Sequence, residues 1–148
     1  MKIKIGQNAP EFEKIKKYLK DNKLLALYFY PKDNTPGCTK EACSLRNGWN
    51  ELKKQGISVV GVSPDSEESH KKFSSMYSLP FPLISDKDKN LLKKYNAWGK
   101  KKLYGKEYEG VLRKTFIIDK SGKIIHIIDK VDTENHAQQI LNFLKIRE

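Results

Sequence analysis

The sequence predicts an α/β protein whose central sheet combines parallel strands with one antiparallel hairpin. Two observations lead to this prediction. Short apolar runs typical of buried strands occupy residues 24–30 and 57–62, and each is followed by a segment with helical spacing or a helix cap. Near the C-terminus, two β-rich runs at 111–119 and 124–131 flank a turn and predict a hairpin. This order of elements is typical of helices packed on the faces of a sheet.

The first half of the chain begins with Asn8-Ala-Pro10 and then alternates between helical and extended patterns. The elements expected there are a helix-like segment at 11–19, a buried strand at 24–30, a helix from Cys38 to about Gln55, and a buried strand at 57–62. The first strand is a continuous apolar run between Lys23 and Pro31. The helix has apolar residues at helical spacing, and Gly56 ends it.

The second half continues the alternation. The elements expected there are a helix at 66–77, a short strand at 82–85, a short helix at 88–97, an exposed loop at 98–110, the hairpin, and a final helix capped by Thr133. Ser66 is a good N-cap followed by an acidic first turn. The loop is expected because its residues are mostly Lys, Gly and Tyr. Right-handed crossovers place the residues after strand 24–30 at the carboxyl end of the sheet, where α/β proteins carry their sites.

Length and cysteine content limit the class of protein. A chain of 148 residues is expected to form one domain, 1–148, with a sizeable core. Two cysteines argue against a disulfide-framework secreted protein. The N-terminus has no apolar run of signal-peptide length, and no apolar stretch approaches the roughly 20 residues of a membrane helix. We therefore expect a soluble cytoplasmic protein with no membrane association.

The formal net charge of +11 raises the possibility of a nucleic-acid partner. All but three of the 29 basic residues are lysines, and they are spread over every segment. Arginine, the residue suited to bidentate phosphate and base recognition, is nearly absent. The composition favours a solvated surface without a specific nucleic-acid partner, and a basic binding module stays open as an alternative.

Cys38 and Cys43 are the only cysteines, and they point to redox chemistry. Cys38 follows a strand and a loop containing Pro and Gly, and it opens a helical stretch. A helix N-terminus stabilises a thiolate, which is the attacking form of cysteine. Five residues on an intact helix separate two Cα atoms by roughly 8–9 Å, which exceeds the ~7 Å limit for a disulfide. The spacing therefore favours a transient disulfide that forms when the helix unwinds.

The segment Tyr28–Cys43 resembles the active-site segment of peroxiredoxins, specifically the Q-type branch, also called bacterioferritin comigratory protein. The family's Pro-x-x-x-Thr-x-x-Cys motif falls on Pro31, Thr35 and Cys38, and the Q-type resolving cysteine falls on Cys43. The likeness covers roughly residues 24–145 and implies a thioredoxin-like fold with a central mixed sheet flanked by helices. The N-terminus departs from the family, because a shorter helix-like segment stands where a β-hairpin is usual.

Two charged residues complete the resemblance. Glu41 matches a glutamate three positions after the peroxidatic cysteine, and Arg113 matches the family's active-site arginine ahead of a strand that ends in Ile-Asp. Arg113 could supply a permanent charge beside the thiolate, with a planar geometry that lysine lacks. Glu41 could orient that guanidinium, and a solvated helix carboxylate is the alternative.

The remaining motif residues can bind the peroxide or shield the thiolate. The Thr35 hydroxyl can donate to the thiolate or to a peroxide oxygen, and can accept in turn. Pro31 has no N–H and can shield the thiolate from solvent. The backbone N–H groups of Gly37 and Cys38 can bind the peroxide and stabilise the developing negative charge.

The resemblance implies a thiol peroxidase active in antioxidant defence. Cys38 would attack H2O2 or an organic hydroperoxide and become a sulfenic acid. Cys43 would then form an intramolecular Cys38–Cys43 disulfide, and thioredoxin or a similar dithiol reductant would restore both thiols. No metal or organic cofactor is expected, because none of the three histidines has metal-ligand spacing to a cysteine. A monomer is expected. The other alternative, a general thiol–disulfide carrier, usually shows Cys-x-x-Cys, which is absent.

Overall fold

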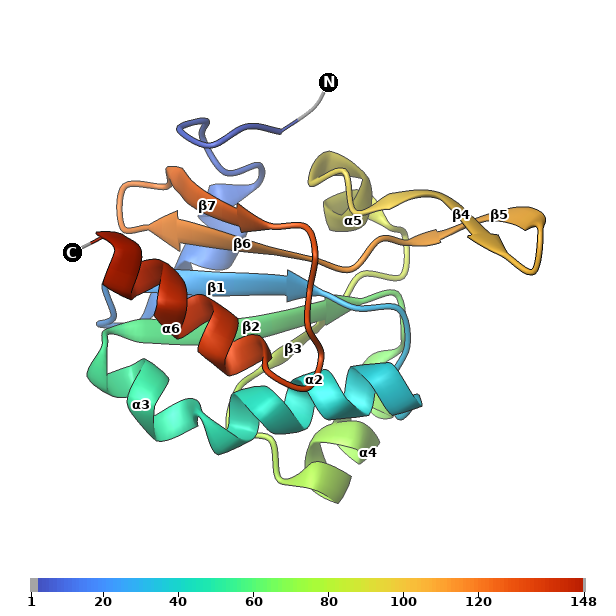
Figure 1. Cartoon of the computed structure of the whole chain (residues 1–148), viewed down its shortest axis with the longest axis horizontal. Coiled ribbons are helices and arrows are strands. Elements are labelled where there is room, and N and C mark those ends of the chain that lie inside the picture. Colours follow the sequence, from blue (N-terminus) through green and yellow to red (C-terminus); the bar gives the residue numbers. More distant parts are fainter. Residues whose placement is uncertain (1–2, 148) are drawn as a thin grey trace.

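A five-stranded mixed sheet lies at the centre of the computed structural model, which describes residues 3–147 (Figure 1). The strands, in the order in which they lie side by side, are β3 (Leu83–Ser85), β2 (Ile57–Ser63), β1 (Leu24–Phe29), β6 (Lys114–Asp119) and β7 (Ile124–Ile128). Neighbours among β1, β2 and β3 are parallel, whereas β6 and β7 are antiparallel to their neighbours. The predicted mixed sheet with a C-terminal hairpin is confirmed.

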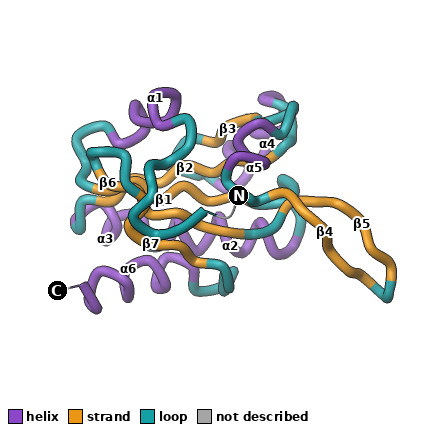
Figure 2. The backbone as a smooth tube through the Cα atoms, turned by 90° about the horizontal axis from the view of Figure 1, so that it is seen from above, coloured by secondary structure: helices purple, strands orange, loops and turns teal. Residues whose placement is uncertain are grey.

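Helices cover both faces of this sheet (Figure 2). They are α1 (Phe12–Ile15), the 3-10 helix η1 (Lys16–Leu19), α2 (Pro36–Asn47), α3 (Trp49–Lys54), α4 (Glu67–Tyr77), α5 (Asn90–Lys94) and α6 (His136–Arg147). Seen from above, α2, α3 and α6 lie on one side of the strands and α1 lies on the other. Among the described residues, no helix is long and apolar enough to cross a membrane.

Strand β1 forms the middle of two hydrophobic cores, because successive side chains point to opposite faces of a sheet. Leu25, Leu27 and Phe29 pack in the core beneath α1, η1 and α5. Ala26 and Tyr28 pack in the other core, together with Cys38 and side chains of α2, α3, α4 and α6. Every residue of β1 is buried, which explains why its sequence is continuously apolar instead of alternating.

The helix predicted from Cys38 to about Gln55 is wrong in its start and its continuity. It begins at Pro36, so Cys38 is the third helical residue, and it is interrupted at Gly48 between α2 and α3. Glycine is a poor helix former. A Cβ atom at position 48 would lie 2.6 Å from the Cβ of Ala137, so the close packing of α6 requires a residue without a side chain there.

The exposed loop predicted at 98–110 is also wrong. These residues form a two-stranded hairpin, β4 (Trp98–Leu103) and β5 (Lys106–Val111), which projects from the body (Figures 1 and 2). Its turn residues Tyr104 and Gly105 both have positive φ, 52° and 78°, as a two-residue hairpin turn requires. Lysines and glycines hide the strand pattern in the sequence. Because Val111 belongs to β5, the predicted hairpin strand 111–119 begins only at Lys114.

The cap predicted at Thr133 is wrong, because α6 begins at His136. The turn before it is organised by Asp132, whose carboxylate accepts hydrogen bonds from the backbone N–H of Glu134 and the side chain of Asn135. The helix-like N-terminal segment is confirmed, as the short helices α1 and η1. The chain before it runs beside β7, with a bridge between Asn8 and Lys123.

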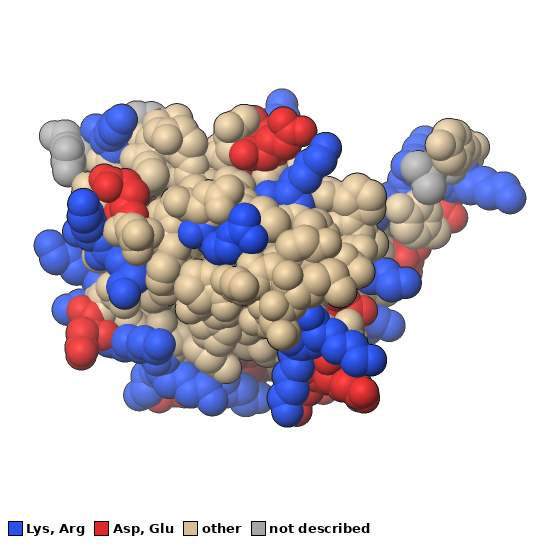
Figure 3. Space-filling model, turned by 90° about the horizontal axis from the view of Figure 1, so that it is seen from below, with Lys and Arg blue, Asp and Glu red and all other residues tan. Residues whose placement is uncertain are grey.

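On the face seen from below, charged side chains are distributed in the way that the lysine-rich composition predicts (Figure 3). On this face, basic side chains surround an extended uncharged area and alternate with acidic ones, and they do not gather in one stripe (Figure 3). This distribution matches a solvated surface better than a groove that follows a phosphate backbone.

Candidate active site

The site lies where β1 leads into α2. Thr35 precedes the helix in extended conformation, Pro36 occupies its first position, and the first helical hydrogen bond runs from the N–H of Thr39 to the carbonyl of Thr35, 2.8 Å. The N–H groups of Gly37 and Cys38 therefore have no partner inside the helix. The Cys38 thiol, only 2% exposed, is held beside these unpaired donors at the positive end of the helix dipole.

Arg113, between β5 and β6, joins Cys38 to a carboxylate. Its Nη2 donates to Cys38 Sγ at 3.4 Å, and its Nη1 donates to Glu41 Oε1 at 2.6 Å. Burial opposes the guanidinium charge, but the neighbouring Glu41 and Cys38 outweigh it and raise the pKa of Arg113. The sequence separates Arg113 from Cys38 by 75 residues, and the packing of β6 against β1 brings them together.

Glu41 is fully buried, so the alternative of a solvated helix carboxylate is wrong. Burial raises its pKa to about 7, although the nearby Arg113 acts in the opposite direction. Its Oε2 lies 3.5 Å from Nε2 of His136 and has no hydrogen-bond partner among residues 3–147. The carboxylate holds the guanidinium from the side away from solvent, in the orientation that presents Nη2 to the sulfur.

The other motif residues surround this group. Thr35 Oγ1 donates to the carbonyl of Lys32 at 2.8 Å, so its one proton is not directed to the thiolate and its lone pairs are left to accept. A Cβ atom at Gly37 would lie 3.3 Å from Arg113 Nη2, so a side chain there would crowd the guanidinium. Pro31 is half-buried and lies two residues after the end of β1.

Cys43 lies on the same continuous helix as Cys38 and is half-buried, and both thiols are free. The premise of the unwinding argument, that both cysteines belong to one regular helix, is therefore met. Within residues 3–147, no group of three or more His, Cys, Asp and Glu side chains could hold a metal ion.

Sequence reasoning missed the residues behind Glu41. Thr115 Oγ1 lies 2.7 Å from His136 Nε2, and His136 Nδ1 lies 2.8 Å from Gln139 Oε1. Burial lowers the pKa of His136 to about 4, so the ring is neutral at pH 7. The Tyr28 hydroxyl is buried nearby without a partner among the described residues. One signal in the sequence was a histidine at the start of an apolar helix, but such a signal does not reveal the neighbours of the ring.

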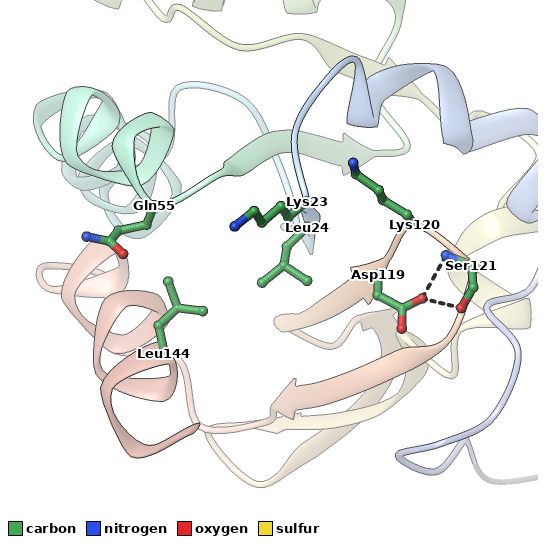
Figure 4. A pocket seen from close by; sticks show the side chains of 7 residues that line it. All are labelled: Lys23, Leu24, Gln55, Asp119, Lys120, Ser121 and Leu144. Carbon is green, nitrogen blue, oxygen red and sulfur yellow. Dashed lines mark hydrogen bonds between the residues drawn. The ribbon is translucent and has the colours of Figure 1, made fainter. Parts of the chain in front are cut away.

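A cavity of about 620 Å³ lies at the other end of β1 (Figure 4). It is lined by Lys23, Leu24, Gln55, Asp119, Lys120, Ser121 and Leu144. Leu24 begins β1 and pairs with Asp119, whereas Cys38 follows the opposite end of the strand. The Asp119 carboxylate in this cavity accepts hydrogen bonds from the N–H and the hydroxyl of Ser121, in the turn between β6 and β7. The cavity is therefore separate from the thiol site.

Comparison with known proteins places this geometry in a family. A model described as the AhpC/TSA family matches residues 5–127. The chain belongs to the AhpC/TSA family. Peroxiredoxin Bcp of Bacillus subtilis is 42% identical over 154 residues, covering 98% of this chain and 97% of the relative. Peroxiredoxin Bcp of Escherichia coli is 40% identical over 150 residues, covering 97% and 96%.

Solved structures of similar proteins agree with the fold. A mutant of Xanthomonas campestris peroxiredoxin Q has a TM-score of 0.79 at 38% identity, covering 86% of this chain and 81% of its own. Peroxidoxin BcpB of Mycobacterium tuberculosis has a TM-score of 0.83 at 29% identity, covering 99% of both chains. The expected thioredoxin-like peroxiredoxin fold and the Q-type resemblance are confirmed, and the chain is a thiol-dependent peroxidase.

Proposed function

We propose that Cys38 is the peroxidatic residue and that the chain reduces H2O2 and organic hydroperoxides. The observation that carries this proposal is the guanidinium of Arg113, which joins Cys38 Sγ to the buried Glu41 at the N-terminus of α2. A solved structure of the X. campestris bacterioferritin comigratory protein concerns the alkyl peroxide reduction activity of that protein, which supports the organic substrate class. Antioxidant defence is the corresponding cellular role.

The first step breaks the O–O bond. The Cys38 thiolate attacks the terminal oxygen of R–O–O–H, an S–O bond forms as the O–O bond breaks, and Cys38 becomes a sulfenic acid. The leaving oxygen takes the bonding electron pair and then a proton, giving an alcohol or water. The N–H groups of Gly37 and Cys38, with Arg113, stabilise the charge that develops on the oxygens. Thr35 accepts a hydrogen bond from the peroxide O–H, since the Thr35 hydroxyl donates its own proton to the backbone carbonyl of Lys32.

Two further residues prepare the site. Glu41 orients Arg113 through the 2.6 Å hydrogen bond. Pro31 closes the edge of the site without presenting an N–H that would need a partner. Both roles act before the peroxide arrives, and they preorganise the donors in a position where water is largely excluded.

The remaining steps return the Cys38 sulfenic acid to a thiol by way of a disulfide. The Cys43 thiol condenses with the Cys38 sulfenic acid, which forms the Cys38–Cys43 disulfide and releases water. A dithiol reductant such as thioredoxin then restores both thiols in two exchanges. Both cysteines belong to one chain, so the cycle needs only a monomer and one domain, 1–148. A dithiol reductant belongs to a reducing compartment, so we place the function in the cytoplasm.

The rival functions have weaker support. A general thiol–disulfide carrier needs no arginine and buried carboxylate behind its thiol, and the two cysteines do not form Cys-x-x-Cys. A basic binding module would not use the thiols at all. A nucleic-acid affinity that is salt-dependent and unaffected by Cys38→Ser would favour that alternative.

Replacing Cys43 by serine should leave the first step intact and stop the second. Cys43→Ser should consume one equivalent of peroxide and then stall as the Cys38 sulfenic acid, unless a small thiol is added. The measurement is peroxide consumption with thioredoxin and its reductase, with mass spectrometry of the stalled product. Multiple turnovers at the parent rate with thioredoxin alone would contradict the resolving role of Cys43.

Disulfide formation should open the first turns of α2. Because both cysteines lie on one helix, their Cα atoms would be roughly 8–9 Å apart in regular geometry, beyond the ~7 Å reach of a disulfide. Amide exchange at residues 38–46 should therefore be faster in the oxidised protein than in the reduced one, whereas strands 24–30 and 57–62 should change little. Equal protection of α2 in both redox states, with the disulfide verified, would contradict the unwinding.

A further inference from the structure

A second buried polar cluster lies on the loop that leads from β1 to α2. The carboxylate of Asp33, a residue that is 7% exposed, accepts hydrogen bonds from three side chains. The Tyr30 hydroxyl donates to Oδ1 at 2.6 Å, and the Ser69 hydroxyl donates to Oδ2 at 2.7 Å. The third partner is Nδ1 of His70 on α4, 2.7 Å from Oδ2. The mechanism proposed for Cys38 uses none of these side chains.

The hydrogen bonds around His70 indicate which protons it carries. Its Nε2 lies 3.0 Å from the carbonyl oxygen of Ile84, which can only accept, so Nε2 must be protonated. Its Nδ1 faces Asp33, which already accepts from two hydroxyl groups and is therefore best satisfied as an ionised carboxylate. Both ring nitrogens then donate, so His70 is an imidazolium paired with Asp33 in the interior.

The surrounding charges favour this state. Burial opposes the imidazolium, but the hydrogen bond and charge of Asp33 outweigh it and raise the pKa of His70, with a further contribution from Asp65. Likewise, the hydrogen bonds from His70, Tyr30 and Ser69 lower the pKa of Asp33 despite its burial. Burial raises the pKa of Tyr30, so its hydroxyl keeps its proton. The cavity beside the ring also carries the titratable residues Tyr18, Glu67 and Lys71.

Apart from Thr35, which caps α2, the loop is held from α4 and from the residue pair that follows β2. The N–H of Asp33 donates to Asp65 Oδ2, just after β2, at 2.6 Å. The next residue, Asn34, has a φ of 57° and accepts a hydrogen bond from the Tyr77 hydroxyl at the end of α4, 3.0 Å. These contacts connect the loop to elements that need not move when α2 opens.

We propose that His70, as an imidazolium bound to Asp33, is a positioning residue for the peroxidase reaction. It holds residues 31–35 in place, so that Pro31 and Thr35 keep their positions at the thiol while the first turns of α2 unwind and re-form. The inference rests on the proposed role of Cys38. His70 lies 32 positions after Cys38 in the sequence, and it acts on the peroxide step through the loop.

The pH dependence follows from the sign of the two pKa shifts. The pKa of His70 is raised on folding. Its contribution to the stability of the folded loop is therefore complete below 6.5, the ordinary pKa of histidine, and is lost as the pH rises through the pKa of the folded state. Because the pKa of Asp33 is lowered, its contribution is present above 3.8 and is lost as the pH falls through the folded value. The loop is therefore held best between about pH 3.8 and pH 6.5, where both contributions are complete, and it loosens as the pH rises through the folded pKa of His70.

The first test is the protonation state itself. Nitrogen NMR of the reduced protein should show protons on both ring nitrogens of His70 at pH 7.5, where a free histidine is mostly neutral. His126, whose pKa burial lowers, should be neutral in the same spectrum and serves as the internal control. A His70 ring with one unprotonated nitrogen at this pH would overturn the proposal.

The second test is kinetic. The rate constant of Cys38 oxidation by H2O2 should fall at alkaline pH in the range where NMR shows that His70 loses its proton. His70→Asn should lack this alkaline fall and react about tenfold more slowly at neutral pH, as expected for the loss of a charge-assisted hydrogen bond. His126→Asn, in which a ring stacked on Phe143 is removed, should keep the parent profile. An alkaline fall that persists in His70→Asn would overturn the proposal.

A third variant separates positioning from loss of the fold. Ser69→Ala removes one of three donors to Asp33, so it should retain a cooperative unfolding transition and slow Cys38 oxidation by less than His70→Asn. If both variants fold and oxidise Cys38 at the parent rate, the positioning role is wrong while the proposed function stands. If the parent itself shows no oxidation of Cys38 by peroxide, it is the proposed function that fails.

Discussion

Cys38→Ser should abolish peroxide reduction. A serine hydroxyl is hardly ionised near neutral pH, even beside Arg113 and the N-terminus of α2, and it is a poor nucleophile toward an O–O bond. The fold should persist, because Cys38 contributes one small buried side chain to a core that is otherwise intact. The measurement is peroxide consumption with thioredoxin, accompanied by thermal unfolding of both proteins.

The matched control for this experiment is Cys43→Ser, which removes the other thiol from the same helix. It should still consume one equivalent of peroxide, whereas Cys38→Ser should consume none. Retention of a first turnover in Cys38→Ser would mean that Cys43 attacks the peroxide, and the proposed order of the two cysteines would have to be reversed.

Arg113→Lys should slow Cys38 oxidation by about 100-fold, the cost typical of losing a preorganised donor to the transition state. Lysine keeps the positive charge, but a single ammonium group cannot reproduce the planar pair of donors that contacts Cys38 Sγ and Glu41 Oε1 together. The Cys38 thiolate should remain more stable than in Arg113→Met, which also removes the charge. The measurements are stopped-flow oxidation by H2O2 and a thiolate titration by ultraviolet absorbance.

The chain offers a matched control in Arg46→Lys. Arg46 also belongs to α2, but its guanidinium donates to the carbonyl of Tyr77 and the side chain of Asn47, not to the thiol. Arg46→Lys should oxidise Cys38 at the parent rate. Equal rates for the parent and Arg113→Lys would show that the two-donor geometry has no part in the reaction.

The sequence predicted secondary structure correctly wherever an element depends on residues that are close together in the chain. The apolar run at 24–30 predicted a strand because all of its side chains are buried between two cores. The position of Cys38 after a strand and a Pro/Gly loop predicted a helix N-terminus. The patterns failed where long-range packing overrides local preference. Gly48 interrupts the helix because α6 packs against it, and residues 98–111 pair as a hairpin despite a composition typical of a loop.

The sequence by itself supplied the proposed nucleophile, its second thiol and the family resemblance, because these depend on residue types at fixed short spacing. Only the tertiary structure decided that Glu41 is buried, that Arg113 contacts both Cys38 and Glu41, and that His136 stands behind them. It also decided that His70 of α4 is paired with Asp33 in the loop before α2. These facts depend on which strands are adjacent and on which groups lose their water, and no short segment of the chain contains that information.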